Sequence, residues 1–151
     1  MKIDYQIKKF EELSNLELYK ILQLRSEIFV VEQNCAYQDI DNLDEKSIHI
    51  LAKNNEEIIA YGRILPPKLA YNECSLGRIV VKNNYRKLKL GYKLMDYILV
   101  EIQTLYPNET IKIMAQSYLL RFYESFGFSI IGNEFLEDNI PHHYMLLEKT
   151  S

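Results

Sequence analysis

The sequence predicts a single mixed α/β domain in which helices cross between the strands of one sheet. Short stretches of alternating apolar and polar residues lie between longer stretches with apolar residues at helical spacing. The chain has 151 residues, of which 48% are hydrophobic and 26% are charged. This length and composition fit one soluble globular domain over residues 1–151. No apolar run approaches the roughly 20 residues of a membrane-spanning helix, so no membrane partner is expected.

The first half of the chain predicts one helix and four strands. The alternation of Ile3, Tyr5 and Ile7 with polar residues indicates a first strand. Ser14 and Glu17 form a capping box, S-x-x-E, at the start of an amphipathic helix. The residues expected on one face of that helix are Leu18, Leu22, Arg25 and Phe29. A loop over 33–45 follows, and three further strands are predicted at 48–52, 57–65 and 76–81.

The second half of the chain begins with a long helix that Pro107 ends. The apolar stripe of this helix consists of Leu90, Leu94, Tyr97, Ile98, Ile102 and Leu105. Gly127 stands where a left-handed residue would end a second helix. The remaining predicted elements are a strand at 111–115, that second helix at 118–126, and closing strands at 128–131 and 144–148. The predicted order is therefore β-α-β-β-β-α-β-α-β-β.

Charge is distributed unevenly along the chain. The net charge is −3, whereas nucleic-acid binding requires a strongly basic domain, so no nucleic-acid partner is expected. Basic residues nevertheless cluster between a predicted strand and the long helix, namely Lys82, Arg86, Lys87, Lys89 and Lys93. Unpaired backbone N–H groups at a helix N-terminus favour an anion. The cluster is therefore either an anion-binding loop or a solvated basic turn.

Two short motifs, Arg86–Gly91 and Arg121–Phe128, follow one another along the chain, and together they resemble those of the GNAT acetyltransferase superfamily. The segment Arg86–Gly91 resembles the R/Q-x-x-G-x-G/A signature, with Lys89 in place of its first glycine. The segment Arg121–Phe128 resembles the FYxxxGF segment of the same family. The segments that are similar to the ElaA-type subgroup are Leu24–Arg25, Phe29–Cys35, Tyr37–Asp41, His49–Leu51 and Glu137–His142. That subgroup also carries a lysine at the position of Lys89.

The resemblance implies the GNAT fold, a mixed central sheet of six or seven strands with helices on both faces and splayed strands in the middle. It implies an N-acetyltransferase that uses acetyl-CoA as co-substrate. The acetyl group would pass to a primary amine of a small molecule or a protein by direct attack in a ternary complex. It also implies a bulged strand at 78–81 and a proton donated by Tyr123 to the CoA sulfur. The residues implied for CoA binding are Ile79, Val80, Val81, Arg86, Lys87, Leu88, Lys89, Leu90, Gly91 and Tyr92.

An acidic stretch without basic residues holds Glu32, Asp39, Asp41, Asp44 and Glu45. Such a stretch either attracts a protonated amine or lies in solvent as a polar loop. Glu32 follows apolar residues, so it is expected to turn inward and act as general base, with His142 as the alternative base. In the GNAT fold this connection borders the acceptor site. The resemblance therefore implies that the stretch 32–41 forms one wall of the acceptor pocket, opposite the cofactor, with Glu32, Gln33, Asp39 and Asp41 as its binding residues.

A non-catalytic acyl-CoA-binding or regulatory module with the same fold is the alternative function. Tyr123 and the acidic stretch favour the enzyme. No metal is expected, because His142 and His143 would point to opposite faces of a strand. The third histidine, His49, is far away along the chain and has no supporting ligand pattern.

The two cysteines, Cys35 and Cys74, form no CxxC motif, and no signal-type apolar segment follows Met1. Both features predict a cytoplasmic protein with reduced thiols. Apolar residues on the closing strands could pair across a two-fold axis, which would give a homodimer.

Overall fold

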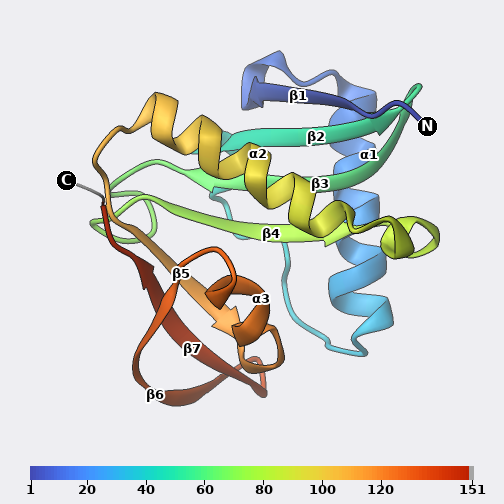
Figure 1. Cartoon of the computed structure of the whole chain (residues 1–151). Helices are drawn as coiled ribbons and strands as arrows, with labels where there is room; N and C mark the ends of the chain where they lie inside the picture. The colour runs from blue at the N-terminus through green and yellow to red at the C-terminus, as the bar shows by residue number, and fades with distance from the viewer. Residues whose placement is uncertain (150–151) are drawn as a thin grey trace.

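The computed structural model describes residues 1–149, in which two antiparallel β-sheets splay apart where they adjoin (Figure 1). The four-stranded sheet has the order β1 (Asp4–Lys9), β2 (Ile48–Asn54), β3 (Glu57–Leu65) and β4 (Ser75–Val81). The three-stranded sheet has the order β5 (Ile111–Gln116), β7 (Ile140–Leu147) and β6 (Ser129–Glu137). The sheets are joined by one parallel bridge between Cys74 and Ile111, beside which the Lys112 N–H donates to the Cys74 carbonyl at 2.9 Å. The predicted fold class and element order are confirmed.

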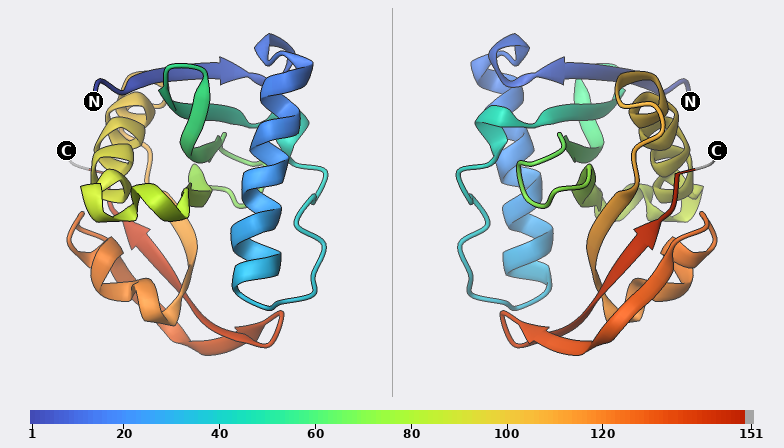
Figure 2. Two further views of the ribbon diagram at one scale, coloured as in Figure 1. Left: turned by 90° about the vertical axis from the view of Figure 1, so that its right-hand side faces the viewer. Right: turned by 90° about the vertical axis from the view of Figure 1, so that its left-hand side faces the viewer.

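Helices cover both faces of the four-stranded sheet (Figure 2). The helices are α1 (Asn15–Arg25), which continues as a π-helix over Ser26–Glu32, α2 (Leu90–Leu105) and α3 (Leu120–Glu124). Short 3-10 turns cover 10–12, 44–46, 83–88 and 117–119. Within residues 1–149, no helix has the length and apolar character needed to cross a bilayer.

Alternation along β2 explains why the sheet needs a helix on each side. Ile50 belongs to the cluster that packs with α2, whereas its neighbour Leu51 belongs to the cluster that packs with α1. Successive side chains on a strand point to opposite faces, so an apolar run buries both faces only between two covers.

The face of α1 that packs on the sheet differs from the predicted one. The buried residues of α1 and its π-helical extension are Ile21, Leu24, Arg25 and Ile28, whereas Leu18, Leu22 and Phe29 are half-buried. Both sets satisfy helical spacing, because apolar residues surround most of this helix. Contact with the sheet selects between the two faces.

The predicted bulge is present in β4. Tyr61 pairs with Val80 and Arg63 with Gly77, so two residues of β4 face one residue of β3. Arg78 takes a left-handed conformation there, with φ +54°. A Cβ on the opposite residue, Gly62, would lie 2.7 Å from Ile79 Cδ1, so the glycine lets Ile79 pack over β3. The extra residue bends the strand and frees its backbone groups from the ladder.

A buried guanidinium ties the loop after α1 to the body of the protein. The Arg25 side chain is fully buried, and its Nε and Nη1 donate to Asp39 Oδ2 at 2.8 Å and Asp44 Oδ1 at 2.7 Å. Its Nη2 also donates to the Asp39 carbonyl at 3.1 Å. The loop between Asp39 and Asp44 thus gains a fixed position without regular secondary structure.

Two arginines from the sheet complete this network. Arg63 on β3 donates to Asp41 at 2.9 Å and to Asp44 at 2.8 Å. Arg78 at the bulge pairs with Asp39 at 2.7 Å. Three guanidinium groups therefore face three carboxylates, and the network carries no net charge.

Replacement of Arg25 by Met should lower the free energy of unfolding by about 3–5 kcal/mol, because it leaves buried carboxylates without their partner. Urea denaturation followed by circular dichroism measures this loss. The matched control is Lys82→Met, which breaks an exposed pair with Glu57 at 2.6 Å and should cost less than about 1 kcal/mol. Equal effects of both substitutions would contradict a structural role for the network.

Stability should also fall in acid because of Glu17 and Asp41. Burial raises the pKa of Glu17, but hydrogen bonds from Lys53 and Lys8 outweigh it and bring that pKa to about 2. Burial also raises the pKa of Asp41, but the hydrogen bond and the charge of Arg63 outweigh it and bring that pKa to about 2. A lowered folded-state pKa stabilises the protein above the unfolded value, and this contribution is lost as the pH falls toward 2.

The free energy of unfolding should therefore drop steadily between the unfolded-state pKa values, near 4, and pH 2. In Glu17→Gln the free energy of unfolding should fall less steeply as the pH is lowered, because glutamine does not titrate and adds nothing to the slope. A slope that is identical in the variant would assign the acid loss to other groups.

Candidate active site

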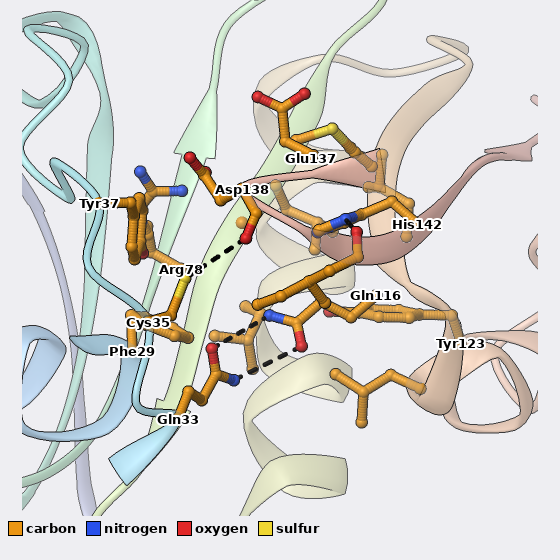
Figure 3. Close-up of a pocket in the computed structure, with 17 residues that line it drawn as sticks. Phe29, Gln33, Cys35, Tyr37, Arg78, Gln116, Tyr123, Glu137, Asp138 and His142 are labelled. Atoms are coloured by element: carbon orange, nitrogen blue, oxygen red, sulfur yellow. Dashed lines mark hydrogen bonds between the residues drawn. The ribbon is translucent and has the colours of Figure 1, made fainter. Parts of the chain in front are cut away.

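Two cavities meet where β4 and β5 splay apart. The helix-side cavity, of about 440 Å³, lies at the N-terminus of α2 and is lined by Val81, Arg86, Lys89, Gly91, Tyr92 and Phe122 among others. The hairpin-side cavity, of about 130 Å³, lies by the turn between β6 and β7 and is lined by Cys35, Tyr37, Arg78, Glu137, Asp138 and His142 among others (Figure 3). Residues that line both are Phe29, Gln33, Ile79, Gln116, Leu119 and Tyr123.

The helix-side cavity ends at an N-terminus suited to an anion. No side chain caps α2, and its first turn contains no acidic residue. Lys89 precedes the helix in a left-handed conformation, with φ +55°, which glycine adopts readily and which costs other residues roughly 1–2 kcal/mol. The first N–H groups of α2 therefore lack side-chain acceptors and lie beside two basic residues, Arg86 and Lys89.

Most of the residues expected to bind CoA line this cavity. Those that do are Ile79, Val80, Val81, Arg86, Lys89, Gly91 and Tyr92. Lys87 and Leu88 are exposed on the 3-10 turn, and Leu90 is buried in the core beneath α2. A Cβ on Gly91 would approach Phe122 no closer than 3.8 Å, so the fold itself leaves room for a larger side chain at this position.

Glu32 does not turn inward as expected. Its side chain is 38% exposed, and its two carboxylate oxygens accept from Arg86 Nη1 and Nη2 at 2.6 Å and 2.5 Å. The hydrogen bond from Arg86 lowers the pKa of Glu32. A carboxylate with a lowered pKa and a guanidinium partner is a poor general base.

Asp39 and Asp41 do not form an acidic wall either. Both belong to the network with Arg25, Arg63 and Arg78, and neither lines the hairpin-side cavity. The stretch contains no basic residue, but the fold brings three arginines to it from other elements. Of the four residues expected to bind the acceptor, only Gln33 lines the cavities.

Tyr123 stands at the junction of the two cavities. It lies on α3 and is 8% exposed, and edge-on contacts with Phe122 and Phe128 hold its ring. Its hydroxyl makes no hydrogen bond to the described residues 1–149. Burial raises the pKa of Tyr123, so the hydroxyl remains protonated at neutral pH and can donate.

His142 on β7 is 7% exposed and lines the hairpin-side cavity. Its Nδ1 lies 2.7 Å from the Ile140 carbonyl oxygen. Because a carbonyl can only accept, Nδ1 carries the hydrogen, and in the neutral ring Nε2 then presents a lone pair. The neighbouring His143 lies 3.0 Å from Ser117 Oγ, and no three His, Cys, Asp or Glu side chains of the described chain are grouped to hold a metal.

Sequence reasoning did not name as site residues four polar residues that line the hairpin-side cavity, namely Arg78, Gln116, Glu137 and Asp138. A signal for the last two was available. Asp138 and Asn139 both have positive φ, as a two-residue hairpin turn requires, and such residues between apolar runs predict a hairpin. Gln33 and Gln116 face each other across the cavity junction at 3.5 Å, and no local pattern predicts this contact.

Comparisons with known proteins agree with this geometry. Residues 15–149 match the family model described as an acetyltransferase (GNAT) domain. Protein ElaA of Escherichia coli strain K12 is 40% identical over 148 residues, which cover 97% of this chain and 97% of that protein.

Two solved structures are similar over nearly their whole length. The crystal structure of Escherichia coli ElaA has a TM-score of 0.91 at 40% identity and covers 97% of this chain and 100% of that one. That of an acyl-CoA N-acyltransferase from Pseudomonas aeruginosa has a TM-score of 0.91 at 35% identity, covering 96% and 99%. The chain therefore belongs to the GNAT acetyltransferase family, as a member of its ElaA-type subgroup.

Proposed function

We propose that the protein is an N-acetyltransferase that moves an acetyl group from acetyl-CoA to a primary amine in a ternary complex. The observation that carries this proposal is the junction of two cavities at Tyr123, a largely buried residue whose hydroxyl has no hydrogen-bond partner among residues 1–149. Direct transfer needs both substrates in contact while each enters from its own side. Enzymes of this family use acyl-CoA as the donor. The helix-side cavity would take this donor, and the hairpin-side cavity would take the acceptor.

The helix-side cavity would hold acetyl-CoA. Its pyrophosphate would accept hydrogen bonds from the first N–H groups of α2, with Arg86 and Lys89 adding positive charge. The pantetheine arm would lie along Ile79–Val81, where the bulge frees backbone groups to hydrogen-bond it. Bound there, acetyl-CoA supplies a thioester whose carbonyl carbon is open to attack from the hairpin side.

Two side chains would handle the protons of the reaction. The attacking amine must be neutral, and Nε2 of His142 offers the lone pair that takes its proton. As the carbon–sulfur bond breaks, the electron pair goes to sulfur, and the Tyr123 hydroxyl would donate a proton to it. Glu32, held by Arg86, is replaced by His142 as the proposed base.

Release of free CoA thiol from acetyl-CoA in the presence of small amines and lysine peptides tests the proposed reaction. Tyr123→Phe should lower kcat roughly a hundredfold and leave the acetyl-CoA KM unchanged, because it removes one proton donor and little volume. His142→Gln should lower kcat to a similar extent.

The matched control for these variants is His143→Gln, on the same strand but outside both cavities. Full activity of Tyr123→Phe would mean that water protonates the sulfur. Binding of acetyl-CoA without thiol release in any amine would favour the non-catalytic acyl-CoA-binding module instead.

Substitution of either partner in the ion pair between Glu32 and Arg86 should change the affinity for acetyl-CoA, but in opposite directions. Arg86→Ala should weaken acetyl-CoA binding, because it removes charge from the phosphate site. Glu32→Gln should tighten binding about two- to fivefold, because the pair is exposed and Glu32 competes with phosphate for the same guanidinium.

Isothermal titration calorimetry with acetyl-CoA measures both affinities. Glu45→Gln, an exposed loop carboxylate outside both cavities, is the control and should bind like the unmodified protein. Weaker binding by Glu32→Gln would instead give Glu32 the role of positioning Arg86 for the phosphates.

A further inference from the structure

A pair of amide side chains spans the junction of the two cavities. Gln33 follows the π-helical extension of α1, and Gln116 ends β5. Each amide nitrogen donates to the oxygen of the other at 3.5 Å (Figure 3). Gln33 Nε2 also donates to the Tyr118 hydroxyl at 3.4 Å. Because both glutamines line both cavities, the pair bridges the seam where the loop after α1 approaches β5.

The other residues that line both cavities are mostly apolar. They are Phe29, Ile79, Leu119 and Tyr123. The thioester of a bound donor would lie among these side chains, beside the Tyr123 hydroxyl. A carbon chain longer than acetyl would leave the junction either into the hairpin-side cavity, which the acceptor needs, or past the amide pair. A longer acyl group therefore competes with the acceptor or has to part the two amides.

Parting the amides is unfavourable for a hydrocarbon chain. Methylene groups between them would break both hydrogen bonds and offer no polar atom in return. Both glutamines are half-buried, so water can replace these hydrogen bonds only in part. At 3.5 Å the bonds are long, and the pair should disfavour longer chains rather than exclude them. An acetyl group ends at its methyl carbon and leaves the pair intact.

From this arrangement we infer that the pair of Gln33 and Gln116 selects short acyl groups, so that acetyl-CoA is used in preference to butyryl-CoA and hexanoyl-CoA. The inference rests on the proposed acetyl transfer and assigns the choice of acyl group within it. In this role Gln33 acts on the donor, whereas the sequence predicts that it binds the acceptor.

Thiol release from acetyl-CoA, butyryl-CoA and hexanoyl-CoA tests the inference. All three thioesters are assayed with one amine, the one that releases most thiol from acetyl-CoA. We expect kcat/KM to fall by about tenfold from acetyl-CoA to butyryl-CoA, as is typical when methylene groups do not fit a pocket, and further to hexanoyl-CoA.

Removal of either amide should relax this selectivity. In Gln33→Ala, kcat/KM for butyryl-CoA should come within about threefold of that for acetyl-CoA, because the junction is open and no hydrogen bond has to break. Gln116→Ala should have the same effect, and the double variant should add little, since one substitution already parts the pair. Gln103→Ala, at an exposed position of α2 outside both cavities, is the matched control and should keep the full selectivity. Circular dichroism checks that each variant is folded.

Calorimetry without an amine measures the same selectivity independently of the reaction. The ratio of hexanoyl-CoA affinity to acetyl-CoA affinity should be about tenfold higher in Gln33→Ala than in the unmodified protein, because methylene groups in the opened space leave water. The ratio should not change in Gln103→Ala.

Equal kcat/KM for the three thioesters in the unmodified protein would overturn the inference, as would glutamine variants that keep the full selectivity. Additive effects of the two substitutions would also overturn it, because each side chain would then act through its own volume. If no amine releases thiol but the calorimetric ratio shifts as expected, the inference stands and the proposed transfer is wrong. If neither thiol release nor the calorimetric shift is found, both are wrong.

Discussion

The buried guanidinium of Arg25 is the constraint on which the candidate site depends. A charge removed from water in this way requires carboxylate partners at hydrogen-bond distance, and Asp39 and Asp44 supply them from the connection between α1 and β2. The segment cannot leave without exposing unpaired charges to an apolar interior. Arg63 and Arg78 pair with the same two carboxylates and so attach this connection to the sheet and to its bulge. One wall of the site is thus held by electrostatics rather than by a ladder of backbone hydrogen bonds.

The other walls depend on a break in the sheet. Among the described residues, the bridge between the sheets joins Ile111 to Cys74, just before β4, so side chains rather than a backbone ladder fill the space between β4 and β5. The bulge at Arg78 bends β4 beside this space, and Tyr123 lines it from α3. Loss of regular pairing at this seam leaves the backbone groups and the hollow that a ligand needs, while intact sheets on both sides keep the walls in place.

The periodicity of the sequence predicts most of the fold, because helices and strands depend on residues a few positions apart. The proposed roles of Tyr123 and of the loop before α2 rest on motifs of the same short range. The expectation of free carboxylates in the acidic stretch does not hold, because their cationic partners are distant along the chain. Arg78 is 39 residues from Asp39, and Arg86 is 54 residues from Glu32. Composition shows the charge of a segment but not what the fold brings to it.

The origin of each sheet in the chain has a consequence for folding. The strands of one sheet all come from residues 4–81, and those of the other from residues 111–147. Each sheet can therefore assemble from its own stretch of chain, and closure of the long loop that joins them is not required first. The two halves nevertheless share one apolar core, which includes Ile50 of the first sheet and Met145 of the second. The groove at their seam therefore takes its shape only when both halves are in place.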